Sequence, residues 1–122
     1  MGKKIKILLV EDEVLISECL NYDLREVGFE TFPFIASGEE AIMAVKEEIP
    51  DIILMDIHLA GEIDGIEAAE EILNSKKIPI IFMTGYEKNE LIQRTNKMKE
   101  VIFLEKPVEI YDITRMIEKV LK

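Results

Sequence analysis

Five polar side chains stand at the ends of apolar runs in this sequence: Glu11, Asp12, Asp56, Thr84 and Lys106. Three carboxylates gathered within about 4 Å would repel by roughly 4 kcal/mol per pair at an effective dielectric constant near 20, so a cation is expected among them. Oxygen ligands, with no cysteine and only one histidine nearby, suit Mg²⁺ or Mn²⁺ better than zinc. If the fold brings these residues together, they could therefore hold a divalent cation.

The same residues could accept a phosphoryl group. Asp56 would be the nucleophile, Lys106 and the cation would offset the charge, and Thr84 would donate a hydrogen bond. Each residue also has a plainer interpretation. Glu11 and Asp12 could be a solvated helix start that complements the helix dipole, and Lys106 could be only a structural ion partner of Asp56. The chemical interpretation therefore depends on a fold that gathers all five.

Apolar runs of four to six residues alternate with helical patterns along the whole chain, which is typical of repeated strand–helix units. The helix starts and stops carry local signals, such as the Ser-x-x-Glu spacing of a capping box at Ser37 and the glycine after the first helix, Gly28. Strands are predicted at 5–10, 29–34, 51–56, 79–84 and 101–104, and helices at 14–27, 37–48, 66–74, 87–100 and 110–121.

Pro33 indicates how the strands are ordered. Proline cannot donate to a strand ladder, so the second strand should lie at a sheet edge. The run 51–56 is apolar on both faces and should be central. Right-handed crossovers then favour a flavodoxin-like (βα)5 fold of class α/β, a three-layer sandwich with a parallel sheet in the order 2-1-3-4-5. In that order the five polar side chains meet at the carboxyl edge of the sheet.

Helical periodicity also predicts which side chains face the core. Cys19, at helical spacing among apolar residues, is interpreted as a packing residue rather than a reactive thiol. The segment 87–100 carries only a thin apolar stripe, and thin packing allows movement. The predicted inward residues are Ile16, Leu20, Leu24 and Val27; Ala41, Ile42 and Val45; Ile66, Ala69, Ile72 and Leu73; Leu91, Ile92, Thr95 and Met98; and Ile110, Ile113, Ile117 and Leu121.

Length and charge restrict the class of protein. The 122 residues suit a single domain over 1–122, with no output domain expected in this chain. With 15 basic and 25 acidic residues, the formal net charge of −10 opposes direct binding to nucleic acid or to anionic membranes. The apolar stretch near the N-terminus stops at Glu11, too short for a signal peptide or membrane span. A single cysteine excludes an internal disulfide and suits the cytoplasm.

Five short motifs stand in order at the predicted strand ends and in the loops that follow them. Any one of them is a weak signal. Together they resemble the receiver domain of bacterial and archaeal two-component response regulators, over essentially the whole chain. The motifs are Glu11-Asp12, Met55-Asp56-Ile57, Asp64-Gly65-Ile66-Glu67, Thr84-Gly85 and Lys106-Pro107.

The resemblance implies a role for each site residue. Asp56 would take a phosphoryl group from a phosphohistidine, and Lys106 would contact that group. The bond from Lys106 to Pro107 would be cis. Thr84 and Phe103 would form a switch pair that responds to phosphorylation. The resemblance also implies a Mg²⁺ site made by Glu11, Asp12, Asp56 and the backbone carbonyl of His58.

The resemblance further implies partners. These are a sensor histidine kinase or a phosphotransfer protein, and a downstream protein target. The protein would be cytoplasmic, a monomer or a phosphorylation-dependent dimer, and would turn over no external substrate.

Ala60 stands where the family often has proline, and the loop is one residue longer than usual before Asp64. A phosphate-independent interaction module on the same fold is the alternative. A dehalogenase-like phosphatase is disfavoured because His58 replaces its second aspartate, and a nucleotide-binding module because Glu11-Asp12-Glu13 would repel phosphate.

Overall fold

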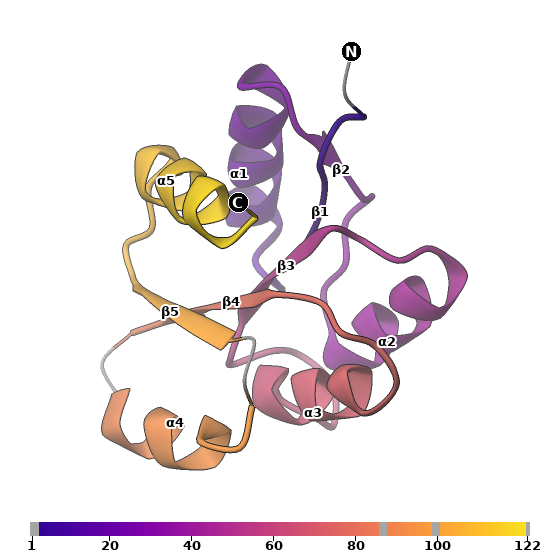
Figure 1. Ribbon diagram of the computed structural model, residues 1–122, viewed down its shortest axis with the longest axis vertical. Helices are drawn as coiled ribbons and strands as arrows, with labels where there is room; N and C mark the ends of the chain where they lie inside the picture. The colour runs from indigo at the N-terminus through magenta and orange to yellow at the C-terminus, as the bar shows by residue number, and fades with distance from the viewer. Residues whose placement is uncertain (1–2, 86–87, 99–100, 122) are drawn as a thin grey trace.

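The computed structural model describes residues 3–85, 88–98 and 101–121. In this part of the chain, a parallel five-stranded sheet lies between two layers of helices (Figure 1). Helices α1 and α5 cover one face, and α2, α3 and α4 cover the other. The elements in order are β1 (Lys6–Val10), α1 (Val14–Glu26), β2 (Glu30–Thr31), α2 (Gly38–Glu47), β3 (Ile52–Asp56), α3 (Gly65–Ser75), β4 (Ile80–Thr84), α4 (Lys88–Thr95), β5 (Val101–Glu105) and α5 (Ile110–Val120).

The strand order is β2-β1-β3-β4-β5, which confirms the flavodoxin-like prediction. Strand β2 lies at the edge, but it is only two residues long, whereas 29–34 was predicted. The N–H groups of Glu30 and Phe32 donate to the Ile5 and Ile7 carbonyl oxygens, so the nitrogen of position 33 faces away from β1. Pro33 therefore fits this open edge without leaving a ladder hydrogen bond unmade. Pairing with β1 resumes only as an isolated bridge between Val10 and Ile35. The central strand β3 pairs with β1 and β4, so its last residue, Asp56, lies in the middle of the carboxyl edge.

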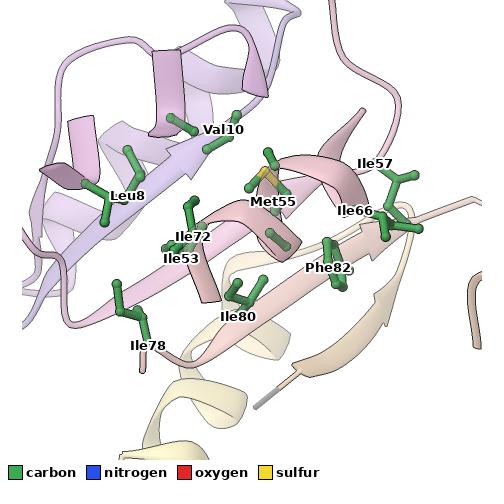
Figure 2. Close-up of a cluster of buried hydrophobic side chains, with 14 of the residues drawn as sticks. Leu8, Val10, Ile53, Met55, Ile57, Ile66, Ile72, Ile78, Ile80 and Phe82 are labelled. Atoms are coloured by element: carbon green, nitrogen blue, oxygen red, sulfur yellow. The ribbon is translucent and has the colours of Figure 1, made fainter. Parts of the chain in front are cut away.

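The core consists of two clusters, one on each face of the sheet. Alternate residues of β3 divide between them, because successive side chains of a strand point to opposite faces. Ile53 and Met55 pack toward α2 and α3, as Figure 2 shows, and Ile52 and Leu54 pack toward α1 and α5. All four are fully buried. Burying each such side chain contributes about 1.5 to 3 kcal/mol, so β3 is firmly held and Asp56 with it.

Helix α1 faces the sheet with a different stripe from the one predicted. Leu20 and Leu24 are buried as expected, but Ile16 and Val27 are exposed, and Cys19 is a free, exposed thiol. The packing interpretation of Cys19 was therefore wrong. The buried stripe follows the spacing i, i+3, i+4, i+7, and a neighbour about 100° further round the helix points away from it. The inward residues of α1 are Ser17, Leu20, Asn21 and Leu24.

Helix α4 has eight residues, fewer than the predicted segment 87–100. Residues 87, 99 and 100 of that segment lie outside the described part. Leu91 and Thr95 are buried, and the Thr95 hydroxyl donates to the Leu91 carbonyl oxygen at 2.8 Å. Ile92 is 47% exposed, so its predicted inward position was wrong: one helical step from Leu91 turns it away from the narrow stripe.

The remaining helices agree with the periodicity apart from one end. Leu121 lies just beyond the last turn of α5 and is exposed, while Ile113 and Ile117 are buried. Among the residues that the structure describes, none of the helices combines the length and apolar character needed to cross a membrane. The predicted inward residues that are only partly buried are Ile42, Leu73, Met98 and Ile110.

Candidate functional site

Three carboxylates meet where β1 and β3 end. Glu11 and Asp12 directly follow β1, Asp56 is the last residue of β3, and these two strands are hydrogen-bonded neighbours. One carboxylate oxygen from each of the three residues lies within 4.8 Å of the others. Glu11 and Asp56 are buried, whereas Asp12 is open to solvent. The fold thus forces like charges together, as the strand-end pattern predicted.

The Glu11 carboxylate is the most constrained of the three. Its Oε2 accepts a hydrogen bond from the Glu13 N–H at 3.0 Å, while its buried Oε1 has no hydrogen-bond partner in the described part of the chain. Burial, assisted by the charge of Asp56, raises the pKa of Glu11 to about 7, against the opposing effects of the Glu13 N–H and Lys106. A buried oxygen that lacks a partner is costly unless an ion contacts it. The three carboxylates therefore fit a divalent cation.

Lys106 supplies the positive charge of the site. Its Nζ lies 3.0 Å from Asp56 Oδ2 and 4.0 Å from Glu11 Oε1. Its backbone N–H donates to the Thr84 carbonyl oxygen at 2.7 Å, which ties the end of β5 to the end of β4. The three carboxylates and this ammonium group leave a formal charge of minus two when all are ionised, which a divalent cation would neutralise.

The fourth and fifth strands carry the other predicted residues, Thr84 at the carboxyl edge and Phe103 in the middle of β5. Thr84 is the last residue of β4 and is buried. Phe103 lies in register with Phe82 across β4 and β5, and the two rings stack with centroids 5.8 Å apart. Phe103 is only partly buried. The Lys106–Pro107 peptide bond is cis.

The loop 57–64, between β3 and α3, follows Asp56 directly and contains His58. At its base the Gly65 N–H donates to the Ile57 carbonyl oxygen at 2.8 Å. A Cβ on Gly65 would lie 2.1 Å from the Asp56 carbonyl oxygen, so this close approach requires glycine. The two ends of the loop are therefore held together, and Gly65 packs directly on the backbone of Asp56.

Asp64 ends this loop and caps α3. Its side chain accepts from the Glu67 N–H and the Glu67 side chain accepts from the Asp64 N–H, a capping box that the Asp-x-x-Glu spacing could have revealed but that was not predicted. Arg94 of α4 contacts Asp64 Oδ2 at 2.8 Å. Burial raises the pKa of Asp64, but Arg94 and the Glu67 N–H outweigh this effect and leave it lowered.

A cavity of about 640 Å³ opens beside the acidic residues, between α1 and the segment that leads into α5. Glu11 and Lys106 line its end nearest the site. Leu15 and Tyr111, at 77% and 65% exposure, are large side chains left open to solvent on its walls. The remaining apolar lining includes Ile16, Leu20, Pro107, Val108 and Ile110, with Cys19 among them.

Comparison with known proteins identifies relatives of this arrangement. The family model for the response regulator receiver domain matches residues 7–118. The transcriptional regulatory protein PdtaR of Mycobacterium tuberculosis is 34% identical over 113 residues, which are 93% of this chain and 55% of PdtaR. The sporulation initiation phosphotransferase F of Bacillus subtilis is 32% identical over 117 residues, 95% of this chain and 93% of the relative. This chain therefore spans about half of PdtaR but nearly all of the phosphotransferase.

Solved structures agree with these relatives. The signal receiver domain of a modulated diguanylate cyclase from Desulfovibrio desulfuricans superposes with a TM-score of 0.87 at 33% identity, covering 98% of this chain and 94% of that one. The receiver domain of PhyR from Erythrobacter litoralis has a TM-score of 0.82 at 31% identity, covering 97% and 90%. With a family match over most of its length and a carboxylate site at the matching strand ends, the chain belongs to the response regulator receiver domains.

Proposed function

We propose that this protein accepts a phosphoryl group on Asp56 from a phosphohistidine of a sensor histidine kinase or phosphotransfer protein, in a Mg²⁺-dependent reaction. The observation that carries the proposal is the placement of Asp56 between Lys106, 3.0 Å away, and the buried Glu11 oxygen that has no hydrogen-bond partner in the described part of the chain. On one side of the Asp56 carboxylate lies an ammonium group, and on the other lie two carboxylates that could bind a divalent cation. The ammonium group and the cation could together neutralise the negative charge of a phosphoryl group on Asp56.

In the proposed reaction, a carboxylate oxygen of Asp56 attacks phosphorus while the nitrogen–phosphorus bond of the donor breaks and histidine leaves. Lys106 would move from Asp56 Oδ2 to a phosphoryl oxygen, and the Thr84 hydroxyl would donate to another. Mg²⁺ or Mn²⁺, when bound, would neutralise charge on the phosphoryl oxygens. Its ligands would be Glu11, Asp12, Asp56 and the backbone carbonyl of His58. Turnover would be limited to formation and hydrolysis of the protein's own aspartyl phosphate.

The proposed output is a change in the second half of the sheet. Thr84 ends β4, Lys106 directly follows β5, and a backbone hydrogen bond joins the two residues. Movement of either residue toward a phosphoryl group would therefore shift the end of β5. Phe103 is partly exposed on that strand and could turn inward. The surface of α4, β5 and α5 would then present a different face to a downstream protein.

The cavity between α1 and α5 supports docking of the phosphodonor. It is mainly apolar, leaves Leu15 and Tyr111 exposed, and opens beside Lys106. An amphipathic helix could lay its apolar face there and bring its phosphohistidine to Asp56. The relative named a phosphotransferase favours onward transfer as one output. We also propose a cytoplasmic protein that acts as a monomer or phosphorylation-dependent dimer, without direct contact to nucleic acid or membrane.

Incubation with Mg²⁺ and acetyl phosphate, followed by intact-protein mass measurement, tests the proposal. The wild type should gain one phosphoryl group and Asp56→Asn none. Asp112→Asn, which removes an exposed carboxylate from the first turn of α5, is the matched control and should behave as the wild type. An unchanged wild-type mass would refute phosphoryl acceptance. Partner affinity that is the same for wild type and Asp56→Asn, with and without the phosphodonor, would favour the alternative of a phosphate-independent interaction module.

A further inference from the structure

We propose that Glu39, on α2 and outside the acidic cluster, is a positioning residue for the site. Its carboxylate holds the tip of the loop 57–64 and thereby orients the segment that carries the His58 carbonyl. The inference rests on the proposed function, because it assumes that this carbonyl helps to hold the cation. Glu39 lies in the first turn of α2, and 23 residues separate it from the loop residue it contacts.

The carboxylate lies directly against the loop backbone. Glu39 Oε2 accepts a hydrogen bond from the Glu62 N–H at 3.0 Å. Gly61 has a φ of +99°, and a Cβ there would lie 2.6 Å from Glu39 Oε1, so the other oxygen packs on the loop as well. Its own N–H and those of Glu62 and Ile63 lower the pKa of Glu39, which keeps the carboxylate ionised and a strong acceptor at neutral pH.

Two neighbouring contacts place this hydrogen bond in a wider junction between α2 and the loop. Ser37, the N-cap of α2, forms a bridge with Ala60, and a Cβ on Gly38 would lie 2.8 Å from the Ile63 side chain. Gly38 therefore allows the start of α2 to pack closely on the loop. With the base closed by the Gly65 N–H and the tip held by Glu39, the segment between them is fixed at both ends.

The function of this junction follows from the composition of the loop. Gly61 and Glu62 are exposed, and glycine has the largest conformational freedom to lose on ordering. Without the Glu39 hydrogen bond, the tip would sample more conformations, and the carbonyl of His58, three residues before Gly61, would point at the cation for less of the time. The main effect of losing Glu39 should be weaker Mg²⁺ binding, because the carboxylates themselves are placed by β1 and β3.

Three variants test the inference. Glu39→Ala removes the acceptor, Glu39→Gln keeps an acceptor oxygen without the charge, and Glu47→Ala removes a glutamate from the last turn of the same helix. The Mg²⁺ dissociation constant is measured by amide chemical-shift titration without any phosphodonor. The Mg²⁺ dependence of phosphorylation by acetyl phosphate is measured separately. Circular dichroism verifies that each variant folds, and alanine suits an exposed helical position.

For Glu39→Ala we expect the Mg²⁺ dissociation constant to rise about three- to tenfold, with the rate at saturating Mg²⁺ changed less than about twofold. Glu39→Gln, whose neutral oxygen is a weaker acceptor than the carboxylate, should raise the constant less than Glu39→Ala does, and Glu47→Ala should stay within about twofold of the wild type. An unchanged constant for Glu39→Ala, or an equal rise for Glu39→Gln or Glu47→Ala, would overturn the inference. Because the titration uses no phosphodonor, a failure of Asp56 to take phosphate would be seen separately.

Discussion

Replacing Glu11 by glutamine should stabilise the metal-free protein and abolish its response to Mg²⁺. The wild-type carboxylate is buried, lies near Asp56 and has one oxygen without a hydrogen-bond partner in the described structure. In Glu11→Gln the amide oxygen can still accept from the Glu13 N–H, and the NH₂ group would stand where the unpartnered oxygen is, facing Asp56. The substitution removes a buried charge and fills the missing hydrogen bond.

The size of the effect follows from the pKa of Glu11, raised from 4.5 to about 7, chiefly by burial. Each pKa unit corresponds to about 1.4 kcal/mol, so the ionised carboxylate costs the folded state at most about 3.5 kcal/mol. Between the ordinary pKa of 4.5, which applies to the unfolded chain, and the raised pKa of about 7, the folded protein binds more protons than the unfolded chain does. The free energy of unfolding of the wild type therefore falls as the pH rises through that window. We expect Glu11→Gln to gain about 2 kcal/mol at pH 8 and little at pH 4.5.

Urea unfolding followed by circular dichroism measures this gain, with a chelator present and at both pH values. Excess Mg²⁺ is then added, which should stabilise the wild type according to its affinity and leave Glu11→Gln unchanged. Glu13→Gln is the matched control, because Glu13 is exposed and its side chain makes no capping hydrogen bond. It should stay within about 0.5 kcal/mol of the wild type.

Three results would refute this reasoning. If Glu11→Gln is no more stable than the wild type at pH 8 without metal, the buried charge is not the cost inferred from the structure. If Mg²⁺ stabilises Glu11→Gln as much as the wild type, Glu11 is not a ligand. A gain equal to that of Glu13→Gln would show a general effect of lower net charge.

Two further substitutions test the loop after Asp56 by its stability. Gly65→Ala should cost about 3 kcal/mol in urea unfolding, since its Cβ would lie 2.1 Å from a backbone oxygen, whereas Gly85→Ala, with open space, should cost less than about 0.5 kcal/mol. Equal costs would contradict the close approach. Asp64→Asn keeps the cap of α3 but loses the partly exposed ion pair with Arg94, so its free energy of unfolding should fall by less than about 1 kcal/mol at neutral pH. This difference should vanish as the pH falls through the lowered pKa of Asp64, because the protonated wild-type carboxyl also loses the ion pair. Asp64→Ala also loses the cap and should cost about 1 kcal/mol more; equal losses for the two would argue against the capping role.

Local sequence patterns were enough to predict the order of the elements and the edge that carries the site. Apolar runs and helical periodicity are local properties, and Pro33 restricts β2 to an edge wherever it pairs. Parallel strands then place the residues that follow them on one side, so Glu11, Asp12, Asp56 and Lys106 meet there. The element ends were less predictable, as at β2 and α4, because pairing and packing decide where each one stops.

Only the tertiary structure decided where the buried stripe runs on α1 and α4, and which distant groups touch. Cys19 and Ile92 satisfy the helical spacing yet point to solvent, because the rotation of a helix is set by the surface it packs on. The Glu39–Glu62 hydrogen bond joins two residues that are far apart in the sequence. The burial of a Glu11 oxygen without a hydrogen-bond partner likewise depends on residues distant in the sequence. Spacing along one chain carries no information about such contacts, since they depend on how the layers pack.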